Sequence, residues 1–272
     1  MKYYQSMIIV TFLLSSFQAD AVWPKWVESI TSKINNVTDV IHHKEFAQAD
    51  QLELHNQTGT IVINSWKQNS IAIEVIVSCP ESSHKDIKID MESIDNIVKI
   101  HTNFIDEKLK ASVVFNILLP KETDITITTK QGDIVIKDVN SQLYLETKQG
   151  DIKLVNPHNT VIATAVCGNI LMRTDSIETS KTFSLISNKG NIEIYTTPII
   201  DSYIYAYAPQ GKILSDLPIT LDSKTTVLNP EVWKSFRQIV HGSIGKPDSK
   251  ITLIADNGSI AIMPYIKQND IF

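Results

Sequence analysis

A few polar side chains in this sequence have the types and spacing that could bind a metal or catalyse a reaction. Asp133 and Asp151 each follow a glycine, and carboxylates stacked in this way can bind calcium. Calcium takes about six to eight oxygen ligands, however, and the tandem glycine-aspartate repeats that supply them are absent. His42 and His43 alone form no metal site, and nothing positions the serine of the turn 83–86 against a base. We therefore predict turn residues here, with no catalytic residue, no metal and no cofactor.

Aromatic residues form the more promising group. Tyr203, Tyr205 and Tyr207 alternate along one segment, which places all three on the same face of a strand, with Tyr144 farther along that face. Such a face can bind a glycan or a strand of another protein through the rings. Alternatively, it can seat a helix that includes Trp233, an interpretation that we favour because an apolar insert begins soon after these tyrosines.

The elements that must position these side chains are marked by glycine. Eight of the nine glycines are followed two residues later by isoleucine, which indicates an internal repeat. Five of them, from Gly132 to Gly211, are spaced 18, 18, 22 and 21 residues apart. Gly242 does not fit the surrounding pattern and is interpreted as a loop glycine together with Gly245. The glycines interpreted as structural turns are Gly59, Gly132, Gly150, Gly168, Gly190, Gly211 and Gly258.

Residues on either side of each turn glycine alternate between apolar and polar. Around Gly150, for example, Leu143, Leu145, Ile152 and Leu154 are the apolar members. The pattern is typical of two short strands joined by a turn, each with one buried and one wet face. Because these units recur every 18–22 residues, they predict an all-β fold, a parallel β-solenoid-like array with one unit per coil. A twisted β-sandwich of hairpins is the alternative that the same alternation permits.

Three segments depart from the repeat. Between the first two turn glycines, longer alternating runs at 71–77 and 113–119 predict a β-meander. Residues 221–249 carry a short apolar stripe after a proline, which predicts a helical insert. In 22–44, the apolar residues of 23–41 recur at helical spacing, which predicts an amphipathic helix or linker. That helix could contact a membrane, but docking over the β array is favoured because its polar face is not strongly basic.

The N-terminus has the three parts of a secretory signal. Lys2 precedes an apolar core at 7–17, and Ala-Asp-Ala at 19–21 forms a cleavage site, so the mature chain is expected to begin at Val22. Export would place the protein in the periplasm, on the cell surface or outside the cell. The predicted organisation is a signal peptide at 1–21, a helix or linker at 22–44, a β-repeat domain at 45–265 and a tail at 266–272.

Composition limits the classes of partner. The 272 residues carry a net charge of −5 and are 43% hydrophobic, which permits a large core but provides no basic stripe for nucleic acid. Only Cys79 and Cys167 occur, so the chain has either one disulfide or two free thiols. Two cysteines so far apart do not form a structural zinc site.

The segment 114–136, VFNILLPKETDITITTKQGDIVI, and its partial repeat LYLETKQGDIKL resemble a bacterial family. The family consists of exported β-strand-repeat proteins described as putative adhesins of uncharacterised function. LELHNQTGTIVI near the start and ITLIADNGSIAI near the end resemble the same pattern, so the resemblance covers roughly residues 45–263. It implies the β-repeat architecture and an adhesin function. The later units depart from Gly-Asp-Ile, with Asn169, Asn191, Lys212 and Ser259 after glycine.

These observations together predict an exported, non-enzymatic β-repeat protein that acts as an adhesin or envelope scaffold through its outer strand faces. One alternative is a glycan-active solenoid enzyme, although no cluster of carboxylates or catalytic motif marks one. A second alternative is a structural protein that self-assembles through its open ends. The sequence does not identify the partner; a glycan and an envelope protein are the two candidate classes, and membrane contact through 23–41 is not favoured.

Overall fold

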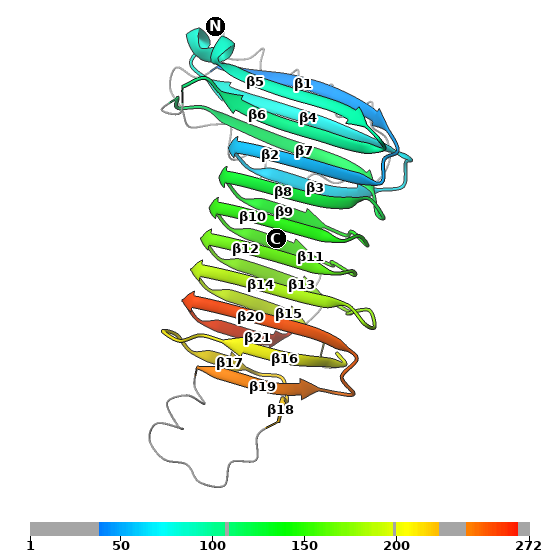
Figure 1. Cartoon of the computed structure of the whole chain (residues 1–272), viewed down its shortest axis with the longest axis vertical. Coiled ribbons are helices and arrows are strands. Elements are labelled where there is room, and N and C mark those ends of the chain that lie inside the picture. Colours follow the sequence, from blue (N-terminus) through cyan, green and yellow to red (C-terminus); the bar gives the residue numbers. More distant parts are fainter. Residues whose placement is uncertain (1–37, 107–108, 198–199, 223–237, 266–272) are drawn as a thin grey trace, which may run out of the picture. The chain divides into compact units, whose positions relative to one another are not determined.

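Two sheets of mostly parallel strands enclose one hydrophobic core (Figure 1). The computed structural model describes residues 38–106, 109–197, 200–222 and 238–265, all within a compact unit at 36–269. The predicted signal peptide, residues 22–37 of the predicted helix and the tail lie outside the described residues. In the described part of the chain, no helix has the length and apolar character needed to cross a membrane.

Each sheet has its own sequence of neighbouring strands. In spatial order, sheet A contains β1 (Thr38–Ala47), β4 (Ser70–Cys79), β7 (Ser112–Pro120), β3 (Ile61–Trp66), β9 (Ile134–Lys137), β11 (Ile152–Val155), β13 (Ile170–Thr174), β15 (Ile192–Thr196), β21 (Ile260–Pro264) and β17 (Ile213–Ser215). Sheet B contains β18 (Thr220–Leu221), β19 (Ile239–Ile244), β16 (Ser202–Tyr207), β20 (Ser249–Asn257), β14 (Thr182–Lys189), β12 (Val161–Cys167), β10 (Leu143–Gln149), β8 (Asp124–Gln131), β2 (Gln51–Thr58), β6 (Ile97–Phe104) and β5 (Ile87–Ile94).

The chain crosses from sheet B to sheet A at each turn glycine. One coil, for example, is β10, Gly150 and β11, and its strands pair in parallel with the equivalent strands of the coils on both sides. Leu143 of β10 lies opposite Ile125 of β8 and Val161 of β12, and all three side chains are buried. Parallel pairing confirms the predicted solenoid-like array, because a sandwich of hairpins would pair antiparallel.

A column of turn glycines runs along the array, with each glycine stacked on the glycine of the next coil. The Gly132 amide donates to the Gln149 carbonyl (2.7 Å), and the next coil repeats this bond from Gly150 to Cys167 (3.0 Å). A Cβ on Gly150 would collide with the carbonyl oxygen of Gly132, and the φ of Gly150 is 142°. The short approach between backbones therefore excludes a side chain, even in coils where the glycine φ is not positive.

The order of the coils in space is not their order in the chain. The last coil in the sequence, β20 and β21, lies between the coil of β14 and β15 and the coil of β16 and β17. Gly258 accordingly stacks on Gly190, and Gly211 stacks on Gly258. The predicted tyrosine strand β16 is therefore one strand farther from β14 than the chain order indicates.

The region between the first two turn glycines is not the predicted β-meander. Its buried runs at 71–77 and 113–119 form β4 and β7, but β7 pairs in parallel with β3, and β6 pairs in parallel with β2. These two strands form a further coil, in which Val113 stacks against Gly59. In this region, antiparallel pairing occurs beside this coil, where β4 pairs with β7 and β1, and β5 pairs with β6.

Two helix predictions are wrong where the structure describes them. Residues 38–44 belong to β1, and the predicted insert at 221–249 contains the end of β18 and the whole of β19. Gly242 lies inside β19, paired with Ile204, and is not a loop glycine. A short apolar run such as 239–240 does not distinguish helix from strand, which explains the error. A short 3-10 helix, η2 (Glu81–Asp86), occurs elsewhere.

We predict that Gly150→Ala lowers the free energy of unfolding by about 2 kcal/mol or more, because the added Cβ meets the Gly132 carbonyl. Urea denaturation of the full chain measures this change. Lys148→Ala, at an exposed position two residues away, serves as control and is expected to change stability by less than about 0.5 kcal/mol. Equal midpoints for the two variants would contradict the stacking argument.

Candidate functional site

The outer face of sheet B carries the four tyrosines singled out from the sequence. Alternate residues of β16 are buried, which leaves Tyr203, Tyr205 and Tyr207 on the outer face. Tyr144 occupies the equivalent face of β10. Tyr203 and Tyr144 are 52% and 44% exposed, an unusual exposure for large rings. Their role in binding stays a prediction.

Strand register connects Tyr144 to Tyr205 through a row of outward residues. Because β20 lies between β14 and β16, Tyr205 lies opposite Thr252, and Thr252 in turn lies opposite Ser184. Four strand spacings of about 4.8 Å put Tyr144 roughly 19 Å from Tyr205, too far for direct contact. From β10 to β19, this cross-strand row is Tyr144, Ile162, Ser184, Thr252, Tyr205 and His241.

The row ends where β16, β19 and β20 lie side by side (Figure 1). An open hollow of about 470 Å³ lies over these strands. The ring of His241 meets the ring of Tyr205 edge-on, with centroids 4.8 Å apart. We call the open hollow at this end of the row the tyrosine hollow. Its lining residues are Tyr203, Ile204, Tyr205, Asp222, His241, Gly242, Lys250 and Thr252.

Two local features shape the tyrosine hollow. The Asp222 amide donates to the His241 carbonyl (3.0 Å), which brings the end of β18 to the rim. Gly242 permits β18 to approach β19, because a Cβ there would lie 2.5 Å from the Thr220 carbonyl oxygen. Sequence analysis missed His241, Lys250 and Thr252, although the Gly-x-Ile at 242–244 is a strand signal that could have located β19.

The hollow combines three kinds of binding group. The rings of Tyr203 and Tyr205 offer apolar faces, Lys250 and Asp222 carry opposite charges, and the remaining groups donate or accept hydrogen bonds. Flat ring faces edged by polar groups suit ligands that are themselves amphipathic, such as sugars and extended peptides. The alternative interpretation, a seat for the helix around Trp233, concerns residues outside the described part of the chain.

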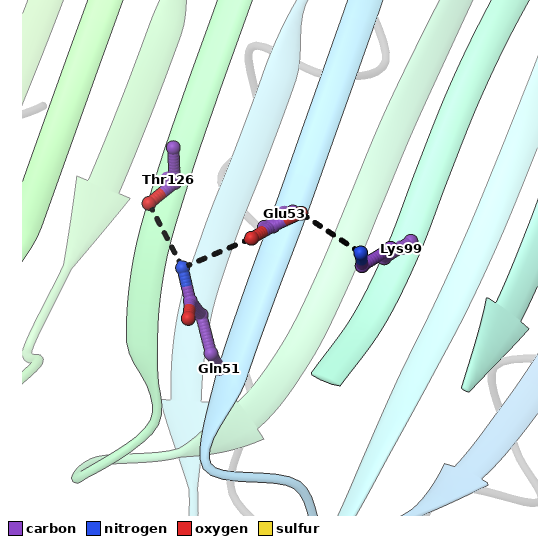
Figure 2. A network of polar contacts seen from close by, with 4 residues as sticks. All are labelled: Gln51, Glu53, Lys99 and Thr126. Carbon is purple, nitrogen blue, oxygen red and sulfur yellow. Dashed lines mark hydrogen bonds and ion pairs between the residues drawn. The ribbon is translucent and has the colours of Figure 1, made fainter. Parts of the chain in front are cut away.

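A second polar cluster on the outer face of sheet B joins three strands (Figure 2). Gln51 donates from Nε2 to Glu53 Oε1 (3.4 Å) and to Thr126 Oγ1 (3.2 Å), and Lys99 Nζ lies 3.8 Å from Glu53 Oε2. These groups bind one another across β8, β2 and β6. Because they are partly exposed, the ion pair adds little stability. The cluster is a cross-strand contact and a weaker candidate for binding than the tyrosine hollow.

The aspartates weighed as calcium ligands serve the turns. The Asp151 amide donates to Asp133 Oδ1 (2.8 Å), and Asp151 Oδ1 in turn accepts from the Asn169 amide (2.8 Å). Asparagine or serine can accept the same bond, which explains why later coils depart from Gly-Asp-Ile. In stacking order, the turn ladder is Asp133, Asp151, Asn169, Asn191, Ser259 and Lys212.

The remaining polar candidates lie at the opposite end of the array. His42 and His43 are in β1, and His84 of η2 contacts Cys79 (Nδ1 to Sγ, 3.3 Å). Within the described ranges, no three His, Cys, Asp or Glu side chains are grouped to hold a metal ion. Cys79 and Cys167 are both free thiols in different sheets.

Comparison with known proteins agrees with this architecture. Residues 117–202 match the sequence model of the family described as Toastrack DUF4097. The predicted resemblance is confirmed. No curated protein matches this chain significantly.

Several solved structures share a partial likeness with this chain. A putative cell adhesion protein from Clostridium sporogenes is 15% identical with a TM-score of 0.48, over 84% of this chain and 100% of that one. A putative adhesin from Bacteroides fragilis is 10% identical with a TM-score of 0.35, over 84% and 97%. A putative lipid binding protein from Parabacteroides distasonis is 9% identical with a TM-score of 0.30, over 84% and 97%. Such low scores leave the function to be argued from the residues of this chain.

We predict that two substitutions of Asp151, a member of the turn ladder, differ in their effect on stability. Asp151→Asn keeps the oxygen that accepts from the Asn169 amide and is expected to leave stability nearly unchanged. Asp151→Ala removes the acceptor and is expected to cost about 1–2 kcal/mol. Thermal unfolding followed by circular dichroism compares the two. An equal loss in both variants would point to the negative charge and away from the hydrogen bond.

The two thiols are predicted to differ in reactivity. Burial raises the pKa of the Cys79 thiol, and the nearby Asp86 carboxylate adds to the rise, whereas Cys167 is half-buried at the end of β12. Because the thiolate is the reactive form, native protein at pH 8 should be alkylated by iodoacetamide at Cys167 first, and at Cys79 at least tenfold more slowly. Peptide mass spectrometry measures both rates. Equal rates before unfolding would contradict the burial of Cys79.

Proposed function

We propose that the protein is an exported, non-enzymatic binding module of the bacterial envelope, with the tyrosine hollow as its contact surface. The observation that carries the proposal is the exposure of Tyr203 beside Tyr205 and His241, on strands held by pairing on both sides. Rigid aromatic groups lose little side-chain entropy on binding, which favours adhesion to a repeated ligand. The signal-like residues 1–21 support export.

A glycan is the partner that the lining of the hollow favours. Sugar rings have apolar C–H faces that pack on tyrosine rings, and hydroxyl groups that can reach Lys250, Asp222 and Thr252. The cross-strand row extends this surface toward Tyr144, so a linear polysaccharide could contact several strands in succession. An extended strand of an envelope protein would use the same aromatic groups.

Self-assembly through the ends of the array is disfavoured by the described edge strands. Edge strands β17 and β18 have three and two residues, too short to template a long strand from another copy. At the other end, β1 directs Lys44 toward sheet B, where Nζ donates to the Met91 carbonyl (2.6 Å). Inward charges on an edge strand are a common protection against edge-to-edge association.

Binding to an immobilised oligosaccharide panel tests the proposal. The Tyr203→Ala/Tyr205→Ala double variant is expected to lose at least tenfold in affinity for any ligand of the wild-type protein, since buried aromatic contacts dominate such interfaces. Tyr144→Ala should lower the affinity only for ligands that are long enough to span the cross-strand row.

Tyr195→Ala is the matched control, because it removes a tyrosine from the outer face of sheet A, far from the hollow. Its binding should equal that of the wild-type protein. Saturable binding that survives the double variant would move the contact surface elsewhere. Turnover of an oligosaccharide by the purified protein would replace the binding module with the glycan-active enzyme.

A further inference from the structure

A second hollow, of about 490 Å³, lies at the other end of the array, where β1 of sheet A faces β5 of sheet B. We call it the end hollow. It is open on one side, and its floor is apolar and only half-buried. Within the array, each coil has another coil packed on either side. In the described residues, no further coil packs beyond β1 and β5 to continue the core. The lining residues are Val40, His42, His43, Lys44, Val77, His84, Ile87, Ile89 and Met91.

The polar side chains at the rim of the end hollow are cationic or can form hydrogen bonds. His42 of β1 lies opposite Val75, whose side chain is buried in the core, so His42 projects to the inner side of sheet A. Lys44 projects to the same side, with Nζ 4.8 Å from the centre of the Phe46 ring and 2.6 Å from the Met91 carbonyl oxygen. The lining includes no carboxylate. The Glu74 carboxylate accepts from Asn116 Nδ2 (2.8 Å) and lies 3.9 Å from Nδ1 of the lining residue His43.

His84 adds a donor that lacks a partner. The Cys79 thiol can donate to His84 Nδ1, which lies 3.3 Å from Sγ. A neutral imidazole that accepts at Nδ1 carries its hydrogen on Nε2. His84 Nε2 is buried and has no hydrogen-bond partner among the described residues. A buried donor left without an acceptor is costly, which indicates that something else accepts from it.

We propose that the end hollow binds a single-chain fatty acid. The alkyl chain lies on Ile87, Ile89 and Met91, and the carboxylate accepts from His84 Nε2 beside Lys44 and His42. The volume lies within the range of about 300–1,000 Å³ that is typical of small-molecule sites. This site is separate from the tyrosine hollow, and its failure would leave the proposed function untouched.

Fatty acid is favoured over two other occupants. A metal ion is unsupported because the described residues contain no suitable group of three ligands. A strand from a second copy could continue the core only beside an apolar inner face of β1. His42 and Lys44, however, occupy alternate inner positions of β1. An anionic head group and an apolar chain match both parts of the lining.

Isothermal titration of the full chain with sodium decanoate, below the concentration at which it forms micelles, tests the site. Decyltrimethylammonium, which has the same chain and a cationic head, is the comparison ligand. We expect decanoate to bind with one molecule per chain and at least tenfold more tightly than the cation. His84→Phe keeps a ring but removes the donor, and it should weaken decanoate about tenfold without changing the binding of the cation.

A matched pair of variants on β5 locates the chain of the ligand. Ile89→Glu places a charge on the floor and should abolish decanoate binding, whereas Ile94→Glu makes the same change at an exposed position and should retain it. Circular dichroism confirms that each variant is folded, and His84→Phe remains decisive if Ile89→Glu is not. Absent decanoate binding, equal affinity for the cation, or full binding by His84→Phe would overturn the proposal.

Discussion

The column of turn glycines, where neighbouring coils leave no room for a Cβ, constrains everything else. Parallel strands in neighbouring coils lie about 4.8 Å apart, and the turn must keep that spacing as the chain passes from sheet B to sheet A. A residue with a Cβ cannot do so, because the carbonyl of the glycine in the adjacent coil occupies its place. Once the turns are fixed in this register, the inward apolar residues and the outward polar residues of every coil are aligned as well.

The turn ladder also explains why one coil ends the stack. Asp151, Asn169 and Ser259 each offer an oxygen to the coil that follows in space, but Lys212 has none to offer. The coil of β16 and β17 can therefore receive this bond from Ser259 but cannot pass it on, and it occupies the last position of the ladder. The coil of β20 and β21 carries Ser259 and can stand between two others. In the observed stacking order, the Lys212 amide donates to Ser259 Oγ (3.2 Å), so the last coil also receives its ladder bond.

The alternation of apolar and polar residues predicted correctly which side chains point into the core, but it did not predict which strands lie side by side. Alternation around Gly150 identified the buried residues of its coil, because the period of a strand decides which side chain points inward. It does not decide which strand lies alongside: β16 is the next sheet B strand after β14 in the chain, but β20 lies between the two. The absence of an acceptor at Lys212 is the signal that could have revealed the stacking order. The end hollow was missed because 38–44 has apolar and polar residues at spacings that fit a helix as well as an edge strand.

Both hollows lie where the regular array of coils stops, and the change in strand pairing at these ends is the physical reason. Within the array, each outward or inward side chain has an equivalent neighbour on both sides, so the surface is even and the core is filled. At the ends, β5 and β19 run antiparallel to their neighbours and break this equivalence. The family match at 117–202 covers regular coils, whose residues are constrained by stacking, and neither hollow has a lining residue within that range. The family match therefore covers the regular scaffold, and both hollows lie in the segments that end it.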